Sequence, residues 1–470
     1  MDNVCTIKDK NLRFTADLLY KTELTLVFDN TKIKCLTIRY SPCSFMFSLE
    51  GDSSTSMELK NGSVITGKQV IIGAPNSELK IGADSSIWAS GQSIVSAGTQ
   101  PSGIGATFIG QAGFCRDMSD DTSYFANAMR VYGYFSRAPQ AKDLSNYNSE
   151  IGSIGKSNDV ETAGGGRIVI YADSVTFEGA GAKVQANARP YVDFTARRYS
   201  LPGGSGGYIY IKTTNEHKKE NTLSSDSTIE AKGGYAIGDY SAGSGGVIIF
   251  DGGFSLSTDQ VYANGGKSQR DDESGCANGA SGTVYRVNDD SLVIDNKDIK
   301  VESSTVLSIP EERSHESEKG LPELAKILTV TGKGNMVIRG MHSALTFDTL
   351  NAFSGSRIEF GQIESELHIR FLHNAHMAAD AFLDFMKTKK VFIYQGVIPG
   401  TDFSKSIVTI GRVFFSQFFA VQGYNVNIIG NVGVPTEFNQ PDKEQTIFAV
   451  ESDSVKVWDD VHIYAGFTLL

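Results

Sequence analysis

A cluster of glycines followed at once by alternating aliphatic residues recurs four times in the middle of the chain. The copies are residues 164–171 (GGGRIVIY), 203–211 (GGSGGYIYI), 243–250 (GSGGVIIF) and 279–286 (GASGTVYR). From Gly166 to Gly207, Gly246 and Gly282 the steps are 41, 39 and 36 residues. Self-similarity at a nearly constant step is the signature of a repeat architecture, so this feature restricts the fold more than any other.

The first three copies also end alike. Their ends are residues 184–187 (VQAN), 229–234 (IEAKGG) and 261–266 (VYANGG), and residues 87–91 (IWASG) match them upstream. Asn-Gly and Gly-Gly supply the positive-φ residues of tight turns, and the apolar residue before them alternates inward with its neighbours. Each repeat is therefore predicted to run strand, turn, strand, turn. We assign structural turns to these glycines: Gly164, Gly165, Gly166, Gly203, Gly204, Gly206, Gly207, Gly243, Gly245, Gly246 and Gly282.

Repeats with such short β-branched strands cannot bury their own apolar faces, so the copies must stack through parallel strands. The predicted fold class is all-β: a parallel β-helix or β-solenoid with glycine-rich turns, a long irregular insertion and at most one or two short helices. The glycines would allow sharp corners and close approach of successive backbones. A step of about 40 residues would then contain two coils of roughly 18 to 24 residues each.

The pattern divides the chain into three parts. Residues 1–58 alternate like strands and form either an N-terminal cap or the first coils, residues 59–300 form the glycine-rich solenoid, and the β-rich residues 301–470 continue it. An insertion over about residues 93–160 interrupts the solenoid, and a loop of this length in a compact array is often functional. Apolar positions at helical spacing between residues 374 and 387 indicate one short helix.

Composition restricts the partners. Lys and Arg number 43 against 54 Asp and Glu, for a net charge of −11, and the basic residues are scattered. Nucleic acids and anionic membranes bind clustered Lys and Arg, so neither is expected. The chain has no apolar run of about 18 residues, and its first residues lack the layout of a signal peptide. We expect proteins or glycans as partners, no nucleic acid and no membrane span in this chain.

The cysteines are five in number and irregularly spaced: Cys5, Cys35, Cys43, Cys115 and Cys276. An odd count without a CxxC pair supports neither a disulfide framework nor a zinc site. Cys35 and Cys43 could pair in an oxidising compartment, but we expect buried free thiols at these positions.

The insertion contains the candidate ligand residues. Asp117, Asp120 and Asp121 form the densest acidic cluster, and Tyr132 and Tyr134 could stack on sugar rings. Acidic clusters in loops are usually solvated. Tyr208 and Tyr210 of the repeats could also stack on sugars, but an aromatic ladder between coils explains all four tyrosines better. We expect no catalytic residue, metal or cofactor. The alternative is a calcium ion bound by the carboxylates of Asp117, Asp120 and Asp121.

Two other chemistries have weaker support. His373 and His376, with His368 and Asp380 nearby, could be drawn as a metal site, but they lack the HExxH spacing. Residues 203–207 (GGSGG) resemble a phosphate loop and match the elbow of serine hydrolases. A phosphate loop needs Lys and then Ser or Thr after its last glycine, and the elbow must open a helix, whereas a strand follows here.

Short motifs follow one another in a definite order at residues 87–91, 110–113, 132–133, 139, 152–155 and 164–168. This series resembles the glycine-rich β-solenoid regions of very large surface or secreted proteins of single-celled eukaryotes such as ciliates, and the resemblance covers about residues 59–290. The histidines of the family's Gly- and His-rich run are absent from residues 111–115. The resemblance implies an extracellular or cell-surface scaffold, and the missing signal peptide and anchor suggest a fragment or a diverged relative.

These observations favour a non-catalytic structural or adhesive scaffold that presents a long face to proteins or glycans. The alternative is a carbohydrate-active β-helix enzyme, either a polysaccharide lyase or a glycoside hydrolase. Such an enzyme would need carboxylates and a basic residue gathered on one face of the stacked coils.

Overall fold

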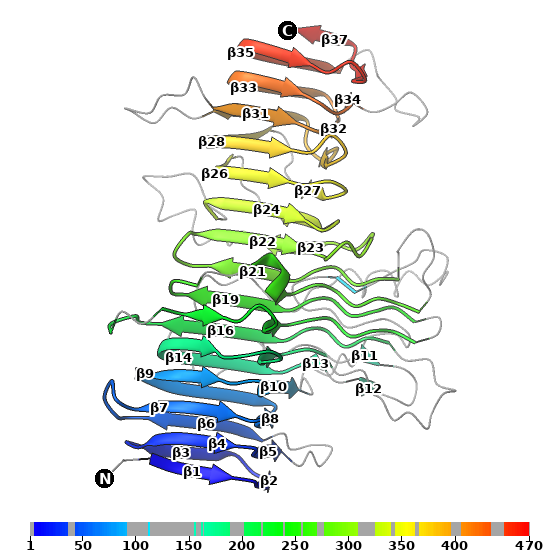
Figure 1. Cartoon of the computed structure of the whole chain (residues 1–470). Helices are drawn as coiled ribbons and strands as arrows, with labels where there is room; N and C mark the ends of the chain where they lie inside the picture. The colour runs from blue at the N-terminus through cyan, green and yellow to red at the C-terminus, as the bar shows by residue number, and fades with distance from the viewer. Residues whose placement is uncertain are drawn as a thin grey trace. The chain divides into compact units, whose positions relative to one another are not determined.

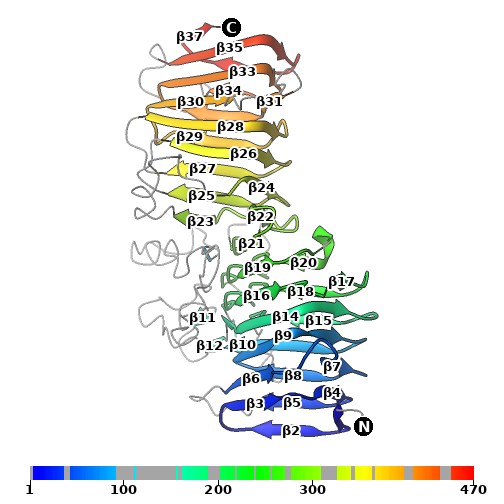
Figure 2. The same cartoon turned by 90° about the vertical axis from the view of Figure 1, so that its left-hand side faces the viewer.

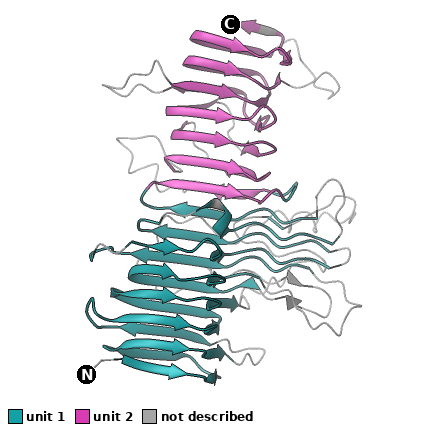
Figure 3. Ribbon diagram, in the orientation of Figure 1, with its two compact units in different colours: residues 1–288, 299–303 teal, residues 289–298, 304–470 magenta. Residues whose placement is uncertain are grey.

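The computed structural model describes residues 4–35, 43–91, 111–112, 155–156, 161–162, 164–188, 202–217, 220–237, 240–254, 257–269, 277–308, 325–339, 344–361, 366–395, 406–433 and 446–469. The chain forms two compact units (Figure 3). Unit 1 comprises residues 1–288 and 299–303, and unit 2 comprises residues 289–298 and 304–470. The predicted all-β parallel solenoid is confirmed.

Unit 1 is built from three stacks of parallel strands (Figure 1). The first stack contains β3 (Leu18–Thr22), β6 (Ser44–Leu49), the start of β9 (Gln69–Ile81), the start of β14 (Arg167–Phe177), β16 (Tyr208–Thr213), β19 (Val247–Asp251) and β21 (Thr283–Arg286). The second contains β1 (Val4–Lys8), β4 (Thr25–Asp29), β7 (Ser56–Lys60), the ends of β9 and β14, and β17 (Thr222–Leu223).

The third stack contains β2 (Asn11–Phe14), β5 (Lys32–Cys35), β8 (Val64–Gly67), β10 (Ser86–Gly91), β15 (Lys183–Gln185), β18 (Thr228–Glu230) and β20 (Val261–Tyr262). Among the described strands of unit 1, two pairs are antiparallel: β11 (Gly155–Lys156) with β12 (Glu161–Thr162), and β10 with β13 (Gly164–Gly165). The helical element described in this unit is a single 3-10 turn, η4 (Thr258–Gln260).

A ladder of β-branched residues fills the interior behind the third stack. Its members lie in register and are at most 6% exposed: Ile33, Ile65, Ile87, Val184, Ile229 and Val261. Because side chains alternate along a strand, the residues next to these point away from the core. The outward positions of β10, β15, β18 and β20 are thereby aligned from coil to coil.

Each glycine repeat forms one coil, and the prediction of two coils per step is wrong. Arg167 of β14 pairs directly with Tyr208 of β16, which pairs with Val247 of β19, and Val247 pairs with Thr283 of β21. Successive repeats are therefore adjacent rungs. The described part of the extra length lies in extended segments that lengthen each coil without adding another.

Asn221 joins three successive coils of unit 1. This side chain is 7% exposed. Its Oδ1 accepts a hydrogen bond from the backbone N–H of Val175 at 2.8 Å, and its Nδ2 donates to Thr213 Oγ1 at 3.0 Å and to the carbonyl oxygen of Gly253 at 2.7 Å. A buried amide with its donors and acceptor paired in this way holds the corner between the first and second stacks.

Unit 2 has the same parallel construction, and Figure 2 shows its labelled strands following one another along the unit. One stack contains the starts of β26 (Ala344–Ala352), β28 (Glu366–Met377), β33 (Phe418–Ile428) and β35 (Ile447–Val457), together with β30 (Lys390–Gln395) and β37 (Phe467–Leu469). Another contains β22 (Ser291–Asp295), β24 (Ile327–Thr331), β31 (Ile407–Ile410) and the ends of β26, β28, β33 and β35.

The third stack of unit 2 contains β23 (Thr305–Ser308), β25 (Asn335–Arg339), β27 (Arg357–Gly361), β29 (Phe382–Phe385), β32 (Arg412–Phe415), β34 (Val432–Gly433) and β36 (Ile463–Tyr464). Phenylalanines stack in the core of unit 2: the ring centroids of Phe385 and Phe419 are 5.8 Å apart, and those of Phe419 and Phe448 are also 5.8 Å apart. Offset aromatic pairs of this kind add to the burial energy.

The helix predicted between residues 374 and 387 does not exist. Residues 374–377 end β28, a turn follows, and β29 covers Phe382–Phe385. Within β29 the side chains alternate, with Leu383 and Phe385 buried and Phe382 and Asp384 half-buried. Across the turn between the two strands, the apolar residues have a sequence spacing that is also typical of a helix.

Candidate functional site

Glycine-rich segments leave the coils of unit 1 at one corner and return to it. The outgoing legs, residues 186–188, 231–236 and 263–268, continue directly from β15, β18 and β20. The returning legs, residues 203–207, 241–246 and 277–282, lead directly into β16, β19 and β21. Figure 1 shows these legs as extended lines running side by side away from the strands. We call them together the glycine lattice.

The returning legs are hydrogen-bonded from coil to coil. Gly203 N–H donates to the carbonyl oxygen of Ser241 at 3.0 Å, and Gly206 N–H donates to that of Ser244 at 2.8 Å. Ala242 and Gly245 donate in the same way to Ala277 and Ala280, both at 2.9 Å. Bonds three residues apart match the three-residue turn of a polyproline II helix, which has no internal hydrogen bonds and must find partners outside itself.

The outgoing and returning legs are also bonded to each other. Gly243 N–H donates to the carbonyl oxygen of Gly234 at 3.1 Å, and Gly246 N–H donates to that of Ala231 at 2.8 Å. In the next coil Gly279 donates to Gly266 at 3.0 Å and Gly282 to Ala263 at 2.6 Å. Gly266 N–H in turn donates to Gly243 of the preceding coil at 2.9 Å. The backbone bonds thus join neighbouring coils into one network.

The lattice leaves no room for side chains at many of its glycines. A Cβ added at Gly203, Gly206, Gly245 or Gly282 would lie closer than 3.0 Å to a backbone carbonyl oxygen of a neighbouring leg. Real Cβ atoms essentially never approach backbone atoms so closely. As in the collagen triple helix, glycine is needed where extended chains meet at a crowded axis.

The assignment of these glycines to turns is therefore wrong. Gly203, Gly204, Gly206, Gly207, Gly243, Gly245, Gly246 and Gly282 lie in extended legs, and Gly164 and Gly165 form the short strand β13, with Gly166 between it and β14. Among the described residues, the glycines with positive φ are Gly62, Gly179, Gly181, Gly252, Gly332, Gly355 and Gly433. Close backbone approach, and not turn geometry, explains the clusters.

An ordered row of polar and aromatic side chains lies on the third stack beside the lattice. Trp88 of β10 is in register with Gln185 of β15, Gln185 with Glu230 of β18, and Glu230 with Tyr262 of β20. Trp88, Gln185 and Tyr262 are half-buried, and Glu230 is 6% exposed. We call this row, with Asn187 and Lys232 on the adjoining legs, the outer strip.

Glu230 is the centre of the outer strip. Its Oε2 accepts hydrogen bonds from Gln185 Nε2 at 3.0 Å and Asn187 Nδ2 at 2.7 Å, and lies 3.2 Å from Lys232 Nζ. Its Oε1 accepts from Thr228 Oγ1 at 2.8 Å. Lys232 Nζ lies 4.2 Å from the centroid of the Tyr262 ring, a cation–π contact.

Burial alone would raise the pKa of Glu230, but the charge of Lys232 and the hydrogen bonds from Asn187, Thr228 and Lys232 outweigh it and lower the pKa below its ordinary value. The carboxylate is therefore ionised and fixed in place. Sequence reasoning missed the strip, although its signal is visible: Gln185, Glu230 and Tyr262 each follow the inward aliphatic residue of the repeat ends.

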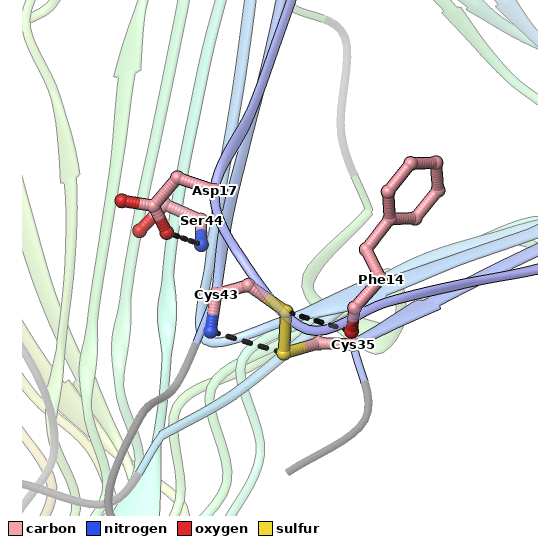
Figure 4. The surroundings of a disulfide bond; sticks show 5 residues. All are labelled: Phe14, Asp17, Cys35, Cys43 and Ser44. Carbon is pink, nitrogen blue, oxygen red and sulfur yellow. Dashed lines mark hydrogen bonds between the residues drawn. A yellow bond between two sulfur atoms is a disulfide. The ribbon is translucent and has the colours of Figure 1, made fainter. Parts of the chain in front are cut away.

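Cys35 and Cys43 form a disulfide, contrary to the expected free thiols (Figure 4). Their Cα atoms are 5.7 Å apart, and eight positions separate them in sequence. Cys43 N–H donates to Cys35 Sγ at 3.0 Å, and Asp17 Oδ1 accepts a hydrogen bond from Ser44 N–H at 2.7 Å beside it. The bond ties the end of β5 to the start of β6, and it is the pairing that the sequence left open as the alternative to free thiols.

The residues predicted to bind ligands fall in different places. Asp117, Asp120, Asp121, Tyr132 and Tyr134 lie outside the described residues. Tyr208 and Tyr210 are 4% and 7% exposed. The rung neighbours of Tyr208 are Arg167 and Val247, and those of Tyr210 are Val169 and Ile249, so neither tyrosine has another tyrosine as a rung neighbour.

The histidines predicted as a weak metal candidate lie on strand β28. His368 stacks on Phe392 with ring centroids 4.8 Å apart and contacts Glu366 Oε1 at 2.6 Å. His373 and His376 are exposed further along the strand. Asp380 Oδ2 accepts hydrogen bonds from Ser354 Oγ and Gly355 N–H in the turn that follows. In the described part of the chain, no group of three or more His, Cys, Asp or Glu could hold a metal ion.

Within the described ranges, no helix has the length and apolar character needed to cross a membrane. Comparison of the sequence with protein-family models and with curated proteins, and of the fold with solved structures, gave no match.

Proposed function

We propose that this chain is a non-catalytic structural or adhesive scaffold of a cell surface or extracellular matrix, presenting a long face to proteins or glycans. The observation that carries this proposal is the glycine lattice. Its legs are bonded both within a coil, as from Gly246 to Ala231, and between coils, as from Gly206 to Ser244. Chains fixed along their length in this way hold whatever they carry at a constant spacing.

The disulfide supports an extracellular setting. Disulfides form and persist in oxidising compartments and are rare in the cytosol. The Cys35–Cys43 bond closes a short segment between two coils of unit 1, where it restricts the unfolded chain. Such a bond suits a scaffold that must remain folded outside the cell.

The charge state of buried carboxylates supports binding over catalysis. A glycoside hydrolase needs one carboxyl group that stays protonated near neutral pH, usually because its pKa is raised. Glu230 has a lowered pKa because the charge of Lys232 and the hydrogen bonds from Asn187 and Thr228 outweigh the effect of burial. Burial would raise the pKa of Asp173, yet hydrogen bonds from Thr214 and His217 lower it overall. Both groups are better suited to holding structure or ligand than to donating a proton.

Surface labelling of intact cells of the source organism tests the proposed setting. A membrane-impermeant biotin reagent should modify lysines of the chain before permeabilisation, with a cytosolic protein as the unlabelled control. Labelling only after permeabilisation would contradict the proposal.

An activity assay tests the non-catalytic part of the proposal. The purified chain incubated with neutral and acidic polysaccharides should release no new reducing ends or unsaturated products. Turnover of any of these polysaccharides would favour the alternative of a hydrolase or lyase.

A further inference from the structure

The outer strip has the composition of a built recognition surface. Two aromatic residues, Trp88 and Tyr262, lie at its ends, and between them Gln185 and Glu230 occupy the two intervening rungs. Neighbouring rungs of a parallel stack are about 4.8 Å apart, so the aromatic residues are separated by about 14 Å along the stack. The side chains between them are held by the hydrogen bonds to Glu230.

From this arrangement we infer that the outer strip binds a linear, neutral oligosaccharide along the direction of the stack, across at least the four rungs from Trp88 to Tyr262. The inference rests on the proposed scaffold function and names the ligand class that one of its faces takes. It depends on the geometry of unit 1 alone.

The residue types fit sugar chemistry. A pyranose has an apolar face that packs on aromatic rings and a rim of hydroxyl groups that both donate and accept hydrogen bonds. The amide nitrogens of Gln185 and Asn187 each carry two hydrogens, and one hydrogen of each is donated to Glu230 Oε2. The second hydrogen and the amide oxygen of Gln185 can meet hydroxyl groups without disturbing the network.

The charge of the strip favours a neutral ligand. Glu230 and Lys232 are paired at 3.2 Å and cancel each other. The chain as a whole carries a net charge of −11 and repels polyanions. A uronic acid polymer or a sulfated glycan would therefore gain no charge pairing here and would meet an unfavourable field.

The regular spacing favours a linear polymer. Equivalent outward positions recur at every rung, and the spacing of the rungs is close to the length of one sugar residue in an extended chain. Preorganised groups lose little conformational entropy on binding, which increases the affinity available from each contact. A row of such positions can bind successive sugars of the same chain.

Isothermal titration calorimetry on the full chain tests the inference, with the hexasaccharides of cellulose, xylan, chitin, mannan and starch as neutral probes and hexagalacturonate as the acidic probe. At least one neutral hexasaccharide should bind, and its disaccharide should bind at least tenfold more weakly. Trp88→Ala and Tyr262→Ala should each weaken binding by about tenfold. Gln185→Ala should also weaken it, while Tyr171→Ala, an exposed tyrosine on the first stack, should not.

Unchanged thermal unfolding midpoints would show that the variants fold. Failure of all the neutral probes to bind, equal loss of binding in Tyr171→Ala, or preference for hexagalacturonate would overturn the inference. None of these outcomes bears on the surface labelling of the chain, so a failure of the strip is distinguishable from a failure of the scaffold proposal.

Discussion

The backbone N–H of Gly246 donates a hydrogen bond to the carbonyl oxygen of Ala231 at 2.8 Å, across the two legs of one coil. The same relationship recurs one coil later between Gly282 and Ala263. A Cβ at Gly246 would lie within 3.0 Å of the carbonyl oxygen of Gly207, and a Cβ at Gly282 would lie within 3.0 Å of that of Gly246. The lattice therefore depends on the absence of Cβ atoms at specific positions.

Replacing Gly245 by alanine should destabilise unit 1 severely. A Cβ there would overlap the carbonyl oxygen of Ala263 and the backbone nitrogen of Gly282, neither of which can move without breaking the lattice. We expect a loss of more than about 3 kcal/mol in the free energy of unfolding, measured by urea titration. Gly73→Ala is the control, because its nearest atom would be 3.9 Å away, and it should change stability by less than about 1 kcal/mol. Equal effects of the two substitutions would contradict the crowded lattice.

Asn221→Ala should weaken the corner that this residue holds. The change leaves the N–H of Val175 and the carbonyl oxygen of Gly253 without their partner. Each buried group left unpaired costs about 1–3 kcal/mol, and hydrogen exchange should accelerate around these residues. Asn11→Ala, at an exposed position of β2, should change stability by less than about 0.5 kcal/mol. A neutral result at Asn221 would mean that water or a shifted backbone replaces its bonds.

Glu230→Gln should alter the acid sensitivity of the chain. Because the pKa of Glu230 is lower in the folded than in the unfolded chain, its ionised form contributes stability above its ordinary value of 4.5. That contribution is lost as the pH falls through the folded-state pKa. The variant should thus be less stable at pH 7, by about 1–3 kcal/mol, and the difference should narrow below about pH 4.5.

Thermal unfolding of the two chains across pH 3 to 8 measures this difference. Glu50→Gln, in an exposed ion pair with Lys21, serves as the control and should have an effect of less than about 1 kcal/mol. A constant difference between wild type and Glu230→Gln at every pH would show that the carboxylate's charge is not what stabilises the strip.

Reduction of the Cys35–Cys43 bond should lower stability by about 2–3 kcal/mol, the chain-entropy estimate for a loop of this length. The thermal midpoint measured with and without dithiothreitol gives the size of the effect. The double variant Cys35→Ser/Cys43→Ser should be insensitive to the reductant at this site. Peptide mass mapping of the untreated protein should find these two cysteines joined and Cys5 open to alkylation. Alkylation of Cys35 without reductant would refute the pairing.

The sequence predicted the rungs well because their causes are local. The aliphatic positions such as Ile168, Ile209 and Ile248 recur after each glycine cluster, and these residues do align in register. Period-two alternation and β-branched residues need no tertiary information to indicate strands. The parallel pairing followed from the repeat itself, since equivalent strands of successive copies must meet.

The conformation of the chain between one strand and the next could not be predicted from local sequence in the same way. The sequence predicted both sharp corners and close backbone approach at the glycine clusters, and only the close approach is found at Gly206 and Gly245, against a neighbouring leg distant in sequence. The prediction of two coils per repeat was wrong because the legs, and not a second coil, account for the length of each repeat. The outer strip was also missed, because Gln185, Glu230 and Tyr262 differ in type and only the register of the coils brings them together.

Hydrogen exchange of the glycine lattice, followed by mass spectrometry on the intact chain, tests the central claim most directly. Peptides covering residues 203–207, 231–234, 243–246, 263–266 and 279–282 contain the bonded amides. We expect these amides to exchange as slowly as those of the strands β14, β16 and β19 beside them. Exchange at the rate of an unstructured chain, with those strands still protected, would show that the legs are ordinary loops and would contradict the lattice.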